Sequence, residues 1–169
     1  LIACGDKELA HYDEAVDRYQ DIFRKCCMYR VEAYEGIREL LEFLKSQGIL
    51  IAVLSNKPHP RTLDNVEGVF GKGYFNLVYG EREDKGIRKK PCPDGVWAIA
   101  EELGLSKSEI LYLGDTNTDM ETGDNAKVDT VGVTWGFRTR EELMAFHPAL
   151  IADHPSRVVQ YIKDVNGIE

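Results

Sequence analysis

Residues 111–119 read Leu-Tyr-Leu-Gly-Asp-Thr-Asn-Thr-Asp, and this stretch decides the fold. A short apolar run that ends in Gly114-Asp115 indicates a buried strand that stops where a carboxylate can face solvent. Asp119 follows four residues later, at the start of an expected helix. Two carboxylates at the carboxyl end of a strand can hold a hard, oxygen-binding cation such as Mg²⁺. The stretch therefore predicts an α/β fold with a divalent-cation site at a strand end.

Strands and helices alternate on both sides of this stretch. Residues 49–54 form a continuous apolar run, which is typical of a strand covered on both faces, and a loop is expected at 55–58. Further strands are expected at residues 77–79, 110–113, 130–133 and 150–152, and helices at 7–29, 37–48, 59–70, 94–103, 120–125, 139–146 and beyond a Ser156 cap. This order predicts right-handed βαβ units, a Rossmann-like parallel sheet with flanking helices.

The composition is that of an ordinary folded protein with an acidic surface. The 169 residues carry a formal net charge of −8, and 43% of them are hydrophobic. Nucleic-acid binding needs a basic surface, so this charge argues against nucleic acid as a partner. No apolar run approaches the roughly 18 residues of a membrane span, so no membrane partner is expected. The four cysteines lack zinc-ligand spacing, which is typical of a reduced, cytoplasmic protein.

Further polar residues fall where the predicted sheet would bring them close to Asp115. Ser55 and Asn56 follow the first predicted strand, and Lys90 lies in a Lys-Pro-Cys-Pro loop before a helix. Taken singly, Ser55 is typical of a turn, Lys90 of a loop and Asp119 of a helix N-terminus. Their order along one sheet edge favours phosphoryl transfer. The hydroxyl and the Asn56 backbone amide would bind phosphate oxygens, the lysine would neutralise developing charge, and the carboxylates would hold Mg²⁺.

These motifs together resemble those of the haloacid dehalogenase superfamily, in its phosphoglycolate phosphatase-like branch. Leu54–Lys57 resembles the second motif of that family, Lys90–Pro93 the third, Gly114–Asp119 the fourth, and Val131–Phe137 the segment after it. The resemblance covers about residues 34–165, which is most of the chain. It implies a Mg²⁺-dependent phosphatase that acts on small phosphate monoesters, with 2-phosphoglycolate as the expected substrate.

The resemblance also implies a role for each site residue. Ser55 and Asn56 would bind the substrate phosphate, Lys90 would be both catalytic and phosphate-binding, and Asp115 would bind the metal with support from Asp119. In the family, an aspartate attacks the phosphoryl group, and water then hydrolyses the aspartyl-phosphate with a second acid assisting. Both acids belong to an Asp-x-Asp-Gly-Thr motif on the first core strand, and no Asp-x-Asp occurs in this sequence.

The missing motif shapes the expected domain organisation. Residues 1–30 resemble the last part of a helical cap, and residues 31–169 resemble the α/β core without its first strand. The chain is therefore expected to be an amino-terminally truncated portion of a longer protein, poorly stable alone and inactive as written. The expected partner is a small-molecule phosphate ester, and the expected assembly is a monomer or a homodimer.

Other functions remain open on the same residues. Pyrophosphate hydrolysis or a sugar-phosphate mutase reaction would use the same scaffold, and the loops of the cap would decide between them. A phosphoacceptor module of the response-regulator kind also binds Mg²⁺ on an α/β sheet, but its acids precede its lysine, whereas Lys90 precedes Asp115 here. A non-catalytic fragment that keeps the fold is the last alternative. The retention of Ser55, Lys90, Asp115 and Asp119 weighs against it.

Overall fold

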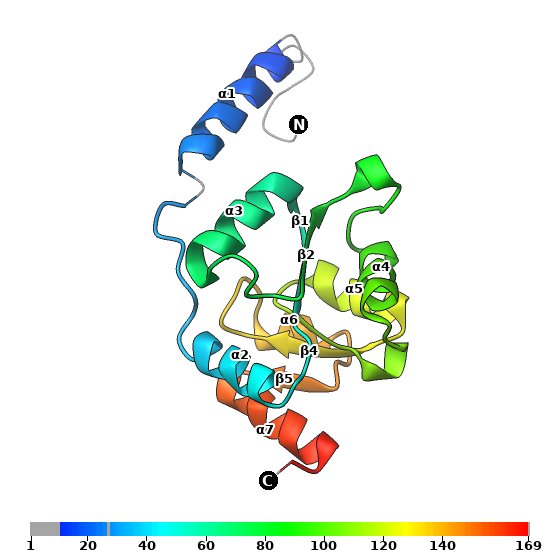
Figure 1. Ribbon diagram of the computed structural model, residues 1–169. Coiled ribbons are helices and arrows are strands. Elements are labelled where there is room, and N and C mark those ends of the chain that lie inside the picture. Colours follow the sequence, from blue (N-terminus) through cyan, green and yellow to red (C-terminus); the bar gives the residue numbers. More distant parts are fainter. Residues whose placement is uncertain (1–10, 27, 169) are drawn as a thin grey trace. The chain divides into compact units, whose positions relative to one another are not determined.

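The computed structural model describes residues 11–26 and 28–168, and the chain divides into two compact units after Glu32 (Figure 1). In the first unit the structure describes helix α1 (Tyr12–Cys26). Of the helix predicted for residues 7–29, the structure describes Tyr12–Cys26; residues 28–29 form a turn, and residues 7–10 and 27 lie outside the described ranges. The assignment of residues 1–30 to a cap stays a prediction. In the described ranges no helix has both the length and the apolar character that crossing a bilayer requires.

The strands of the second unit are all parallel, but they form two separate sheets. β1 (Ala52–Pro58) pairs with β2 (Leu77–Glu81), and β4 (Asp129–Val133) lies between β3 (Leu111–Gly114) and β5 (Leu150–Ala152). The predicted α/β fold with parallel strands is therefore confirmed. Among the residues described, β1 pairs only with β2 and β3 only with β4. One edge of β1 and one edge of β3 thus have no strand partner.

Helices cover the sheets of this unit. They are α2 (Ile37–Ser46), α3 (His59–Phe70), α4 (Asp94–Leu103), α5 (Asn117–Ala126), α6 (Arg140–Met144) and α7 (Pro155–Asn166), with short 3₁₀ turns at Glu83–Lys85 and Lys107–Glu109. Helix α3 packs on β1 and β2, whereas α5 packs on β3 and β4. Helices α2 and α7 pack together, as do α4 and α5 (Figure 1).

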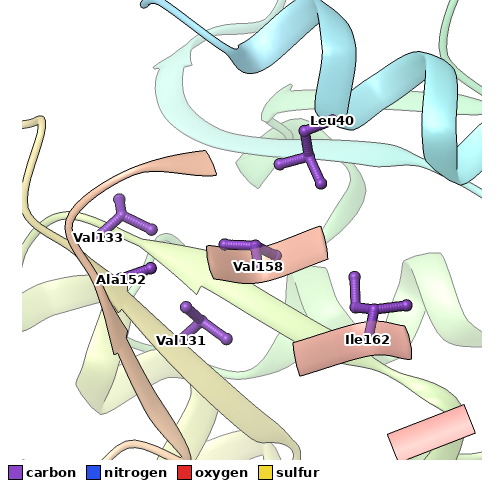
Figure 2. Packing of buried hydrophobic residues seen from close by; sticks show 6 residues of the cluster. All are labelled: Leu40, Val131, Val133, Ala152, Val158 and Ile162. Carbon is purple, nitrogen blue, oxygen red and sulfur yellow. The ribbon is translucent and has the colours of Figure 1, made fainter. Parts of the chain in front are cut away.

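The main hydrophobic cluster lies between the three-stranded sheet and helices α2 and α7. Figure 2 shows its buried side chains, which are Leu40, Val131, Val133, Ala152, Val158 and Ile162. The i, i+3, i+4 spacing of apolar residues places one stripe of each helix against the sheet. Burial of such side chains contributes about 1.5–3 kcal/mol each relative to exposure. This packing holds β3, β4 and β5 in a fixed arrangement, and β3 is directly followed by Asp115.

Leu143 on α6, a helix that packs against β4, gives a direct test of burial in this unit. Its side chain is fully buried, whereas the next residue, Met144, is exposed. Leu143→Ala should lower the free energy of unfolding by about 2–5 kcal/mol, because it removes buried methyl groups and leaves a cavity. Met144→Ala is the matched control and should change it by less than about 0.5 kcal/mol. Urea unfolding of both variants measures the difference. Equal losses in the two variants would contradict the burial pattern.

The predicted loop at residues 55–58 is wrong. Ser55 and Asn56 lie inside β1, which begins at Ala52 and continues to Pro58, where it pairs with Glu81 of β2. The ladder is irregular between Leu54 and Pro58, so the pairing resumes after a local shift in register. The residue types of this segment favour a loop, but Leu54 and Pro58 pair with β2 on either side of residues 55–57 and keep the segment in the strand.

Two helix starts also differ from the prediction. Helix α5 begins at Asn117 because the Thr116 side chain accepts a hydrogen bond from the Asp119 backbone and forms a capping box. The last helix is capped by His154 and not by Ser156, whose backbone N–H donates to the imidazole. The capping box predicted at Thr139 is confirmed, with Glu142 as its partner.

Candidate active site

Asn56 joins the end of β1 to the loop that carries Lys90. Its side-chain Nδ2 donates to the Lys90 carbonyl at 3.0 Å, and its Oδ1 accepts from the Lys90 backbone N–H at 2.8 Å. Beside it, the Ser55 hydroxyl oxygen accepts from the Lys57 backbone N–H at 3.1 Å, which fixes its direction. The sequence predicted phosphate binding by the Asn56 amide, but it did not reveal this side-chain clamp on Lys90.

The Lys90 ammonium connects the two sheets. Its Nζ donates to Asp119 Oδ1 at 2.6 Å, and it also approaches the Leu54 carbonyl of β1 at 3.4 Å. The side chains of Lys90 and Asp119 are only 14% and 8% exposed, so this ion pair is largely removed from water. The peptide bond between Lys90 and Pro91 is cis, and Asn125 donates to the Pro91 carbonyl at 2.9 Å. The loop is thus held by asparagines on two sides.

The Asp119 carboxylate holds the Lys90 ammonium in place and is itself fixed by further hydrogen bonds. Besides Lys90, its oxygens accept hydrogen bonds from the Tyr112 hydroxyl at 3.2 Å and from the Thr116 hydroxyl and backbone N–H at 2.6 and 3.2 Å. Burial acts to raise the pKa of Asp119, but the charge and hydrogen bond of Lys90, together with the hydroxyl donors, hold that pKa below its usual value. Burial beside this carboxylate raises the pKa of Tyr112. The metal role predicted for Asp119 stays a prediction.

Burial and Lys90 have opposite effects on the pKa of Asp119, so removal of the lysine should reverse the contribution of Asp119 to the pH dependence of folding stability. In the native protein the lowered pKa means that Asp119 stabilises the fold above the usual carboxyl value of 3.8, and this contribution is lost as pH falls through the lower folded pKa. In Lys90→Met, burial acts without a compensating cation, so the pKa should rise above its usual value. Stability should then decrease as pH rises through it. Urea unfolding between pH 3 and 7 measures both profiles, and parallel profiles would contradict this assignment.

Asp115 follows β3 directly and is held from a different direction. The Phe137 backbone N–H donates to Asp115 Oδ2 at 3.0 Å. Trp135 packs against the hydrophobic cluster, whereas Phe137 is 84% exposed. The contact of the Trp135–Phe137 turn with Asp115 was not predicted. Its position after β4, at the same sheet edge as the end of β3, is the signal that could have indicated it.

Two of the described residues, Asp115 and Asn117, have oxygens of the kind that a magnesium shell uses. No group of three or more His, Cys, Asp or Glu side chains within the described ranges is arranged to hold a metal ion. Asp115 offers a carboxylate, and Asn117 has a buried Oδ1 without a hydrogen-bond partner. Mg²⁺ is commonly held by one or two carboxylates and completes its octahedron with water and substrate phosphate. The donors present therefore fit Mg²⁺ as one side of such a shell.

Together these contacts place the predicted residues at the carboxyl ends of β1 and β3. The structure brings Asn56, Lys90 and Asp119 into direct contact, with Ser55 adjacent to Asn56 and Asp115 at the end of β3. An open depression of about 370 Å³ lies elsewhere, against α3 and β2, and includes His59 and Phe75. None of the predicted site residues lines it.

The match to a family model decides the affiliation of the chain. The model described as haloacid dehalogenase-like hydrolase matches residues 4–133. The chain belongs to this family. The resemblance seen in its motifs is thereby confirmed, and the parallel strands with flanking helices are the fold of its haloacid dehalogenase-like relatives.

Relatives within the haloacid dehalogenase-like hydrolases include phosphatases of different specificity. A phosphoglycolate phosphatase of Pectobacterium atrosepticum is 28% identical over 90% of this chain and 64% of its own length. An N-acetylmuramic acid 6-phosphate phosphatase of Pseudomonas aeruginosa is 30% identical over 88% of this chain and 64% of its own length. A crystal structure provisionally assigned as a Lactobacillus delbrueckii phosphoglycolate phosphatase superimposes with a TM-score of 0.84 at 28% identity, over 96% of this chain and 65% of that one. The chain thus spans about two thirds of the length of these relatives.

Proposed function

We propose that this chain belongs to a Mg²⁺-dependent phosphatase of small phosphate monoesters, with 2-phosphoglycolate as the first candidate substrate. The observation that carries the proposal is the position of Lys90 Nζ, between the Leu54 carbonyl of β1 and the Asp119 carboxylate that follows β3. A buried ammonium at the convergence of two strand ends is suited to a phosphoryl group. The family affiliation supports the same reaction class.

In this proposal each residue has a defined task. The Ser55 hydroxyl and the Asn56 backbone N–H bind phosphate oxygens, and Lys90 neutralises the charge that develops on the transferred group. An ammonium about 4 Å from a phosphoryl oxygen contributes roughly 4 kcal/mol at an effective dielectric constant near 20. Asp119 holds the Lys90 ammonium in position, and Asp115 would hold Mg²⁺. The metal, when bound, supplies Lewis-acid stabilisation of the phosphoryl oxygens.

The attacking carboxylate is proposed to come from a strand outside the described residues. Within these residues β1 and β3 each have an edge without a strand partner, and Leu113 on β3 is 36% exposed although it is apolar. A strand parallel to both would pair with their free backbone groups and cover such side chains. Its carboxyl end would then lie beside Ser55, Lys90 and Asp115. An aspartate there could attack a phosphoryl group and form an aspartyl-phosphate.

The test is hydrolysis of a set of phosphate compounds with and without Mg²⁺. The set comprises 2-phosphoglycolate, N-acetylmuramic acid 6-phosphate, pyrophosphate and a hexose phosphate, which is also assayed for isomerisation. The proposal expects no turnover by the 169-residue chain alone and Mg²⁺-dependent release of phosphate by an extended protein, in which this chain is combined with a strand that carries the attacking aspartate. Preference for pyrophosphate or isomerisation of the hexose phosphate would replace the proposed substrate class. Absence of turnover by the extended protein on every compound would overturn the proposal.

The setting of the enzyme is part of the same proposal. Cys26 is an exposed free thiol and Cys92 a half-buried one. Free thiols are typical of a reducing compartment, which supports a cytoplasmic location. The partner is proposed to be a small phosphate ester, and the assembly a monomer or a homodimer. Light scattering of the purified protein would measure that assembly.

A further inference from the structure

The turn after β4 touches Asp115 closely enough to control its position. The Phe137 backbone N–H donates to Asp115 Oδ2 at 3.0 Å, although 22 residues separate the two. A β-carbon placed on Gly136 would lie 2.0 Å from the same oxygen and 2.4 Å from the β-carbon of Asp115. The backbone of Gly136 is not in the left-handed region, so the need for glycine at this position is spatial. Any larger residue at Gly136 would force Asp115 or the turn to move.

The turn is itself held at both ends. On its β4 side, the Thr134 backbone N–H donates to the Ala152 carbonyl at 3.0 Å, and Trp135 packs against the hydrophobic cluster. On its other side, Thr139 begins α6 with a capping box. A segment fixed in this way cannot easily relax around an added methyl group. The strain of a substitution at Gly136 should therefore fall on the Asp115 side chain.

The contact leaves one oxygen of Asp115 available. Oδ2 is engaged by Phe137, whereas Oδ1 makes no hydrogen bond to any residue that the structure describes. We infer that Gly136 and the Phe137 amide form a positioning turn, which fixes Oδ2 and thereby presents Oδ1 of Asp115 to Mg²⁺. The inference rests on the proposed function, because it deepens the role given there to Asp115. Groups that orient a metal ligand through a hydrogen bond typically change metal affinity 10- to 100-fold when they are lost.

The experiment compares Mg²⁺ binding by three proteins in the form that hydrolyses the phosphate ester. Gly136→Ala should weaken Mg²⁺ affinity 10- to 100-fold in isothermal titration calorimetry, because the added methyl displaces Asp115. Arg138→Ala is the matched control, since it removes an exposed side chain next to the turn and leaves Gly136 and the Phe137 N–H in place. Its affinity should stay within about threefold of the wild type, as expected for an exposed side chain outside the metal shell. Equal affinities of Gly136→Ala and wild type would overturn the inference.

Two further measurements separate the possible failures. Phe137→Pro removes the donor N–H without adding volume at Gly136, and it should also weaken Mg²⁺ binding 10- to 100-fold. This variant provides the test if Gly136→Ala does not fold. In amide NMR spectra, Asp115→Asn should shift the Phe137 N–H resonance if the hydrogen bond exists, whether or not Mg²⁺ binds, and an unmoved resonance would overturn the inference. A wild type that neither binds Mg²⁺ nor turns over would overturn the proposed function together with the turn. If the wild type binds Mg²⁺ and neither Gly136→Ala nor Phe137→Pro loses affinity, the positioning role of the turn would be overturned and the proposed function would stand.

Discussion

Lys90→Ala is expected to lower kcat about 10²- to 10³-fold in the active protein, which is the range for losing one preorganised charge stabiliser. The reason is structural as well as electrostatic. Lys90 is largely buried, and its ammonium is fixed by Asp119 at 2.6 Å while Asn56 holds its backbone from β1. Such a charge needs little reorganisation when phosphate binds. Its removal also leaves Asp119 as a buried carboxylate without a cation, which costs stability.

The matched control is the neighbouring Lys89. Its ammonium forms exposed ion pairs with Glu81 and Glu83 at 3.1 and 3.4 Å, away from Asp119. Lys89→Ala should therefore leave kcat within about twofold, since exposed ion pairs contribute little. Steady-state kinetics with saturating Mg²⁺ measures both variants. A loss below fivefold in Lys90→Ala, or an equal loss in Lys89→Ala, would refute the catalytic assignment of Lys90.

Asp115→Asn should remove Mg²⁺ dependence together with activity. The substitution keeps the size of the side chain but replaces the charged carboxylate by a neutral amide, and hard cations strongly prefer carboxylates. The Phe137 N–H can still donate to the amide oxygen, so the fold around the turn should persist. Turnover is measured against Mg²⁺ concentration in wild type and variant, with circular dichroism to check folding.

Asp124 provides the control for this second prediction. It lies on α5, its side chain is exposed, and its ion pair with Lys127 at 3.2 Å joins neighbouring surface positions. Asp124→Asn carries the same chemical change and should leave the Mg²⁺ response unchanged. Mg²⁺-stimulated turnover that survives in Asp115→Asn would show that another residue holds the metal.

Segments with strong local signals were predicted with their observed bounds. Helix α4 spans residues 94–103 and β5 residues 150–152, as expected from the spacing of their apolar residues. Thr139 and Glu142 fixed the start of α6 through a local capping box. The segment 55–58 was predicted as a loop and is a strand, because pairing with β2 is a tertiary effect. The secondary-structure preference of a short segment does not indicate a pairing strand that lies more than 20 residues away in the sequence.

The same distinction applies to the candidate site. The sequence indicated which residue types gather at the strand ends, and the structure brings Asn56, Lys90 and Asp119 into contact. It did not indicate how they are held. The clamp of Asn56 on Lys90 spans 34 residues, and the contact of Phe137 with Asp115 spans 22. Both are made by loops whose relative positions depend on the packing of whole helices and sheets. Contacts of this kind can therefore be identified only from the three-dimensional structure.

Trapping the phosphoenzyme tests the central claim most directly, namely that Ser55, Lys90 and Asp115 serve an aspartate carried by a separate strand. The extended protein is mixed with ³²P-labelled phosphate ester and Mg²⁺, quenched, and digested, and the labelled peptide is sequenced. The account predicts label on an aspartate outside residues 11–26 and 28–168, with the label lost when that aspartate is replaced. Label on Asp115, Asp119 or any other residue of the described core would contradict it, as would steady turnover without any labelled aspartate.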